Sequence, residues 1–444
     1  MDSRKVHTEK PEDALDDLTL DSKALPKDPL IDEIVNQHMS ELGAHLTKSR
    51  DRNHLPGAAV AVRKGRRIVH LNCYGYANLE SGTKITPTTV FDLGSLSKQF
   101  TAIAVLDLVN RKKLNVNDPL SNFFKGFPRY ADAITVDDLV HHTSSLPDYL
   151  AIYVESRRAE GDWYDVALAK PDEWYPQMLT GKKEITNKDV LKWIATQTLL
   201  PRPPDTEYKY SNSGYVVLAE LVQRVTRKRF SSLLKEQLFN PYGMKDTFVF
   251  DEVSRFSPDA PEIVNHAKCY NRVNGRYVPV GYTPLNFITG DGNVHSTIVD
   301  MARWEKLLTE LDDLSDCPNS SNVRETLWTP VKLKSRKQVH YGWGWNLLSE
   351  KYEVKVKGLS RKYESRAEYH RGEWLAWRSY VARGSRWVVP KADKDIDPKT
   401  FESLGIIVLS NNNQFNACRI AQNISRVYWG PLKKDNIMNN FNCG

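Results

Sequence analysis

The chain has 444 residues, of which 40% are hydrophobic and 26% charged, so it is long enough to bury a large core. Its net charge of +7 comes from dispersed side chains, without a long basic run, so we expect no nucleic-acid partner. A mean hydropathy of −0.52 and the lack of a long apolar run argue against a membrane protein.

The N-terminal 28 residues are polar, carry both charge signs and are predicted to form a disordered tail. They contain no apolar core of a signal peptide. The five cysteines are odd in number, scattered and without a C-x-x-C pair, which is typical of unpaired thiols in a reducing compartment. We therefore expect a cytoplasmic protein.

A helix is predicted after Asp28-Pro29, with apolar residues at helical spacing as far as Leu42. Residues 57–62 predict a buried strand, and a Lys-Gly-Arg turn leads into a second strand at 68–74. An amphipathic helix is expected from Ser95 to about Asn110.

Further helices are predicted at 136–142, 187–198 and 213–226, and residues 150–185, rich in Trp, Tyr and charge, suggest an insertion. The last third predicts a helix at 415–428 after strands at 342–347, 353–357, 364–370, 375–382, 387–389 and 405–409. Strands near both chain ends with helices between them predict an α+β fold, in which one sheet lies beside a mainly helical lobe. We place this domain at 29–432, followed by a tail at 433–444.

Ser95-Leu96-Ser97-Lys98 is an S-x-x-K sequence that directly follows a glycine and begins a long apolar helix. The Ser95 hydroxyl then lies at the positive end of the helix, and Lys98 lies one turn later on the same face. A partly desolvated lysine can help to remove the proton of a serine. The same residues also fit a capped helix start with an exposed lysine. Two other matches, at 81–84 and 232–235, are predicted on a turn and inside a helix.

The segment from Phe91 to Thr101 resembles the active-site segment of class C β-lactamases, D-alanyl-D-alanine carboxypeptidases and related esterases. That family has two further motifs, and Tyr210-Ser211-Asn212 resembles its Y-x-N, whereas His370-Arg371-Gly372 resembles its H-x-G. Weaker similarities lie at 142–149, 240–244, 290–304 and 341–345, so the likeness extends from about residue 30 to 430. It implies a β-lactamase/transpeptidase-like fold, with an antiparallel sheet flanked by helices, and no cofactor.

The resemblance also implies the catalytic groups. Ser95 would form an acyl-enzyme, and Lys98 with Tyr210 would carry out acid/base catalysis. Asn212 would accept a hydrogen bond from Lys98 and donate to the substrate. The amide of Glu373 would join that of Ser95 in an oxyanion hole.

The third motif would form one edge of the pocket. His370 would be a positioning or electrostatic group, and Gly372 would let the substrate lie close to a strand. Arg371 stands where the family usually has a small residue, and Glu373 follows the glycine. This bulky charged pair could narrow the site or recognise a charged substrate.

We therefore expect a serine hydrolase that acts on an ester, lactone, amide or β-lactam carbonyl of a small or peptide-like substrate, with an esterase or amidase favoured. One alternative is an acyltransferase of the same family, and another is a non-catalytic ligand-binding or assembly-forming descendant. No metal site is predicted, since the adjacent His141 and His142 point apart and no H-E-x-x-H sequence occurs. The oligomeric state stays open.

Overall fold

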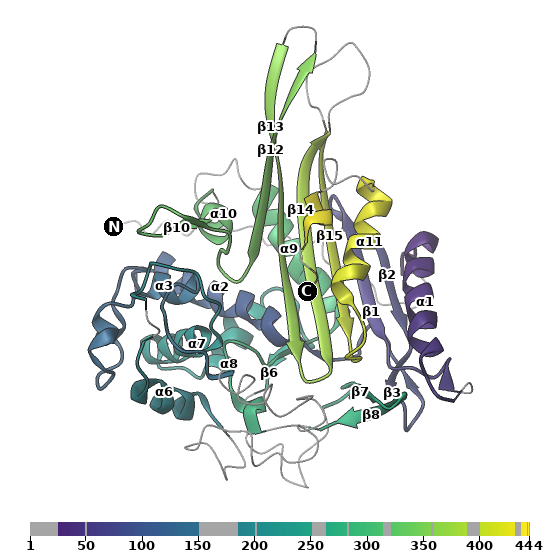
Figure 1. Ribbon diagram of the computed structural model, residues 1–444, viewed down its shortest axis with the longest axis horizontal. Helices are drawn as coiled ribbons and strands as arrows, with labels where there is room; N and C mark the ends of the chain where they lie inside the picture. The colour runs from purple at the N-terminus through teal and green to yellow at the C-terminus, as the bar shows by residue number, and fades with distance from the viewer. Residues whose placement is uncertain are drawn as a thin grey trace, which may run out of the picture.

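The computed structural model describes residues 25–48, 51–150, 185–199, 202–250, 263–281, 284–313, 321–356, 359–388, 400–430, 437–441 and 443. At its centre lies a six-stranded sheet in the order β12-β13-β14-β15-β1-β2, with every neighbouring pair antiparallel (Figure 1). Its strands are β1 (Ala58–Lys64), β2 (Arg67–Tyr74), β12 (Asn346–Val356), β13 (Leu359–Trp374), β14 (Trp377–Val388) and β15 (Thr400–Ser410). The prediction of one sheet built from both chain ends is confirmed, because β1 pairs directly with β15.

Helices cover both faces of the central strands of this sheet. Helices α1 (Pro29–Ala44) and α11 (Ala417–Trp429) cover one face, and α9 (Ile298–Asp313) packs against β1 and β15 (Figure 1). Side chains of β1 alternate between two cores, with Val60 and Val62 in the core of α1 and α11 and Ala59 and Ala61 in the other. A strand buried on both faces reads as an unbroken apolar run, which explains the sequence of β1.

The helical lobe lies beside the sheet (Figure 1). Its helices are α2 (Ser97–Asn110), α3 (Val136–Val140), α6 (Asn187–Thr196), α7 (Asn212–Thr226) and α8 (Phe230–Leu234). Helix α7 packs against α2, α3 and α6. The predicted amphipathic character of α2 is wrong. Polar and apolar residues alike are buried along it, because protein surrounds the helix on nearly all sides.

Shorter elements connect these layers. They are β3 (Tyr76–Asn78), β4 (Thr83–Lys84), β5 (Phe91–Asp92), β6 (Phe248–Val249), β7 (Cys269–Val273), β8 (Arg276–Val280), β9 (Val294–Ser296), α10 (Ser321–Trp328), β10 (Val331–Lys332) and β11 (Gln338–Val339). Strand β9 pairs with both β5 and β6, so it ties the segment before Ser95 to the segment after Asp291.

The last third differs from the prediction in its strand boundaries. The strand expected at 353–357 is the second half of β12, and the one expected at 387–389 overlaps the end of β14. Leu375 and Ala376 form the tight turn between β13 and β14, not a strand, since Trp374 pairs with Trp377. Leu375 accordingly has a left-handed φ of 48°.

Residues 437–441 lie in the segment predicted to be a tail, but they pack into the folded domain. Ile437, Met438 and Phe441 are buried in the core that contains α11. Cys443 forms a disulfide with Cys418 of α11, so the expectation of unpaired thiols is wrong for this pair. Cys73 and Cys269 are free. The disulfide also removes the cysteine argument for a reducing compartment. Within the described residues, none of the helices is both long and apolar enough to cross a bilayer.

Candidate active site

Ser95 lies in a 3₁₀ turn (Gly94–Leu96) between β5 and α2. Gly94 has a left-handed φ of 53°, which favours glycine, and its amide donates to Asp92 Oδ1 at 2.8 Å. The Ser95 side chain is half-buried. This turn holds the hydroxyl at the beginning of α2 and open to a pocket.

Lys98 lies one turn into the helical segment and is fully buried. Its amino group donates to Ser95 Oγ at 3.0 Å, to Asn212 Oδ1 at 2.8 Å and to the Asp291 carbonyl at 2.7 Å. Burial lowers the pKa of Lys98 to about 8, although the nearby Asp291 and Asp148 carboxylates oppose this shift. The lysine can therefore lose its proton near neutral pH.

Tyr210 precedes α7, and its phenol lies near the side chain of Ser95. The Lys98 nitrogen lies 5.0 Å from the centre of the Tyr210 ring. Burial nevertheless raises the pKa of this phenol, and the nearby carboxylates of Asp148 and Asp291 raise it further. Tyr210 is thus a neutral phenol at rest. The nearby Lys98 amine does not offset these effects.

Asn212 begins α7 and connects Lys98 to a buried carboxylate. Its Oδ1 accepts from Lys98, as the resemblance implies, and its Nδ2 donates to Asp148 Oδ2 at 3.0 Å. These two contacts fix the orientation of the amide.

The end of β13 packs against the turn of the nucleophile, backbone to backbone. A Cβ on Gly94 would lie 2.9 Å from the Glu373 nitrogen, and a Cβ on Gly372 would lie 1.9 Å from the Leu93 carbonyl oxygen. Ser379 of β14 reinforces the contact by donating to that same oxygen at 2.7 Å. The structure therefore brings the amide of Glu373 beside the turn that carries Ser95.

His370 is buried within an aromatic cluster that comprises His142, Tyr210, Tyr341 and His370. Its Nε2 lies 3.1 Å from the Tyr341 hydroxyl, and burial lowers its pKa to about 3. It is therefore neutral at ordinary pH. The neighbouring Arg371 is exposed at the edge of the strand.

Four side chains at the site were not assigned a role from the sequence. His142, with a left-handed φ of 58°, accepts from the Ser211 amide at 3.2 Å and packs against the Tyr210 ring in a tilted arrangement. Tyr149 donates to Asp291 Oδ2 at 2.8 Å, and Asp148 orients Asn212. These three residues and Asp291 lie in the segments 142–149 and 290–304, which resemble the family more weakly. That resemblance was the sequence feature from which a role at the site could have been predicted.

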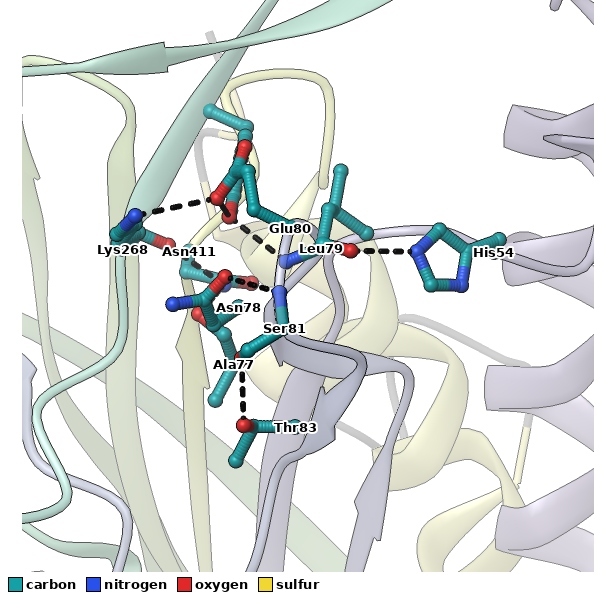
Figure 2. Close-up of polar contacts among 10 residues, drawn as sticks. His54, Ala77, Asn78, Leu79, Glu80, Ser81, Thr83, Lys268 and Asn411 are labelled. Atoms are coloured by element: carbon teal, nitrogen blue, oxygen red, sulfur yellow. Dashed lines mark hydrogen bonds and ion pairs between the residues drawn. The ribbon is translucent and has the colours of Figure 1, made fainter.

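The other two S-x-x-K matches lack this arrangement. Ser81 lies on the turn between β3 and β4, where its amide donates to Asn78 and its hydroxyl contacts Thr83 (Figure 2). Lys84 turns away to lie over the Tyr76 ring, with its nitrogen 3.4 Å from the ring centre. Ser232 lies inside α8, as predicted.

Among the residues described, no group of three His, Cys, Asp or Glu side chains is arranged to hold a metal ion. The interpretation of 150–185 as an insertion falls on residues 151–184, which lie outside the described part of the chain.

Known proteins show the same fold and sequence pattern. Penicillin-binding protein 4* of Bacillus subtilis is 26% identical over 66% of this chain, and a D-aminopeptidase of Gluconobacter oxydans is 28% identical over 65%. The chain spans 60% and 48% of the length of these two relatives. The structure of an octameric penicillin-binding protein homologue from Pyrococcus abyssi superposes with a TM-score of 0.64 at 21% sequence identity. The match covers 91% of this chain and 78% of the homologue. The sequence pattern of the Beta-lactamase family matches residues 32–427, and the chain belongs to that family.

Proposed function

We propose that the protein is a serine hydrolase in which Ser95 attacks an ester, lactone, amide or β-lactam carbonyl. The observation that carries the proposal is the 3.0 Å contact between Ser95 Oγ and the buried amine of Lys98. The Tyr210 phenol lies near the same hydroxyl. A serine with a base within hydrogen-bonding distance is the arrangement that nucleophilic catalysis requires.

In the first step, neutral Lys98 takes the Ser95 proton while Oγ bonds to the carbonyl carbon. The oxyanion that forms is stabilised by the amides of Ser95 and Glu373. Tyr210 gives its proton to the leaving group, and protonated Lys98 then passes on the proton that it took from Ser95 to restore the phenol, so the phenol need not be an anion at rest. Water then attacks the acyl-enzyme by the reverse proton path and releases the acid.

An acyltransferase would use the same first step and differ only in the acceptor that attacks the acyl-enzyme. Added alcohols or amines would then appear in the product, which chromatography of the reaction mixture detects. A non-catalytic descendant is disfavoured, because Lys98 donates to both Ser95 and Asn212 and the Tyr210 phenol lies near them. Among the names of the relatives, D-aminopeptidase makes amides of D-amino acids the first substrates to test.

Labelling with a fluorescent phosphonate tests the nucleophile. We expect one label per chain, lost in Ser95→Ala and retained in Ser81→Ala, which changes the serine of another S-x-x-K sequence. A wild-type protein that stays unlabelled and inert towards p-nitrophenyl esters and amino-acid anilides would show that the proposed function is wrong. Labelling that survives Ser95→Ala would assign the chemistry to another residue.

A further inference from the structure

A line of three titratable side chains leads from the surface to the turn that carries Ser95. Asp92 ends β5 and is 2% exposed, His295 lies in β9 and is fully buried, and His266 is partly exposed. Asp92 and His295 lie directly opposite each other where β5 pairs with β9, so their side chains share one face. The acid/base steps at Ser95 use none of these three groups.

Asp92 holds the nucleophile turn by its backbone. Its Oδ1 accepts from the Gly94 amide at 2.8 Å, which fixes the left-handed glycine directly before Ser95. Both Asp92 and Ser95 line the pocket at the site. A carboxylate accepts a hydrogen bond more strongly than a neutral carboxyl group does, so the charge of Asp92 affects how firmly the turn is held.

The other oxygen of Asp92 faces the two histidines. Oδ2 lies 3.7 Å from His295 Nε2, and His295 Nδ1 lies 3.0 Å from His266 Nε2. A single proton between the two imidazoles satisfies the second contact, and a further proton gives the pair a positive charge beside the carboxylate. Phe248 stacks on His295 with 5.4 Å between the ring centres. The histidines therefore form an electrostatic partner for Asp92 that reaches the surface at His266.

The other groups around Asp92 bring its ionisation into the neutral pH range. Burial raises the pKa of Asp92 to about 7, and the nearby Asp291 carboxylate adds to the rise. Burial also raises the pKa of the Cys269 thiol to about 12, so this neighbour in β7 is neutral. Glu373 adds a carboxyl group at the exposed rim of the same pocket. A protonated His295 acts in the opposite direction, since a positive charge favours the carboxylate.

We propose that Asp92 is a positioning residue for Ser95, which it holds in the reactive orientation while it is ionised. His295, bonded to His266, is its electrostatic partner. This inference rests on the proposed hydrolase function. Protonation of Asp92 weakens its hold on the turn, so the Ser95 hydroxyl loses its alignment with the substrate carbonyl. Full reactivity then needs two deprotonations, one at Lys98 and one at Asp92.

Asp92→Asn tests the role of the charge, because the amide keeps the shape and the acceptor oxygen but does not ionise. The rate constant of phosphonate labelling is measured between about pH 5.5 and about pH 9, on either side of the Asp92 titration. At about pH 9 we expect the wild type to react roughly tenfold faster than the variant, because a charged acceptor holds the turn better than a neutral one. At about pH 5.5 the two rates should differ by less than about twofold, because Asp92 is then mostly protonated.

Asp107→Asn is the matched control. It changes a surface carboxylate of α2 that pairs with Arg111, and it should follow the wild type at every pH. The Lys98 titration should appear in all three proteins, because the carboxylates that act on the pKa of Lys98 are those of Asp291 and Asp148. A purely structural role of Asp92 lowers the rate by one factor at every pH. Such a constant ratio would overturn the inference, and so would equal rates at about pH 9.

His295→Phe tests the partner, because it keeps an aromatic ring beside Phe248 and removes the imidazole. Loss of this protonatable neighbour raises the pKa of Asp92, so the fall in rate that belongs to Asp92 should move to higher pH. A move to lower pH would contradict the role of His295.

Should Asp92→Asn fail to fold, the wild-type profile decides. At about pH 5.5 its rate should lie several-fold below the curve for the titration of Lys98 alone, and a profile that follows Lys98 alone would overturn the inference. The absence of labelling in the wild type at every pH is a different result, because it refutes the hydrolase itself.

Discussion

Gly372→Ala tests whether the contact between β13 and the nucleophile turn is required for catalysis. The added Cβ would lie 1.9 Å from the Leu93 carbonyl oxygen and 2.1 Å from Ser379 Oγ. Both distances are shorter than the 3.0 Å below which Cβ contacts are essentially never found. The Leu93 carbonyl belongs to the backbone, so it cannot rotate away as a side chain can. Ser379 can rotate, but it then loses its 2.7 Å hydrogen bond to Leu93.

Relieving these overlaps requires β13 and the turn to separate by roughly 1 Å, a displacement that can cost about 10²-fold in rate at an active site. The amide of Glu373 moves with the strand, and loss of one oxyanion donor costs about 10² to 10³ in kcat. The strain of overpacking costs about 1–3 kcal/mol of unfolding free energy. We therefore expect Ser95 to react about a hundredfold more slowly in a protein that still folds.

The assay measures the rate constant of Ser95 labelling by the phosphonate, together with urea unfolding of the same sample. Gly281→Ala is the matched control, because a Cβ there meets no atom within 4 Å. Labelling of Gly372→Ala at the wild-type rate, with unchanged stability, would refute the reasoning, because the two backbones would then not be in contact.

Other predictions concern proton transfer and the disulfide. Because neutral Lys98 is the proposed base and its pKa is about 8, the labelling rate should rise with pH and reach half its maximum at about 8; a flat profile contradicts this. Asp148→Asn removes a carboxylate that raises the pKa of Lys98, so the midpoint should move to lower pH, and a shift to higher pH contradicts the assignment. Cys443→Ser opens a disulfide across 25 residues and should cost about 3.5 kcal/mol of unfolding free energy by loop entropy. Dithiothreitol should lower the unfolding free energy of the wild type by the same amount as the substitution and leave that of Cys443→Ser unchanged. An equal effect on both proteins would contradict the disulfide.

Much of the fold follows from local sequence patterns. The helix after Asp28 and the final helix show helical periodicity, and the buried strand at Ala58–Lys64 shows a short unbroken apolar run, so all three could be predicted from local sequence. The order of the three motifs likewise predicted which distant segments meet at Ser95. The strand boundary predicted at residue 375 was wrong, because the left-handed turn at Leu375 carries no glycine to mark it.

The sequence by itself thus determined the family, the sheet built from both chain ends and the Ser95, Lys98, Tyr210 and Asn212 group. Only the tertiary structure decided the protonation of Lys98 and Tyr210, because burial shifts the pKa of both side chains. That burial depends on segments that are distant in the chain. The Asp291 carbonyl on Lys98 and the Cys418–Cys443 disulfide are also long-range contacts. No local pattern records them, because such contacts exist only once the chain has packed.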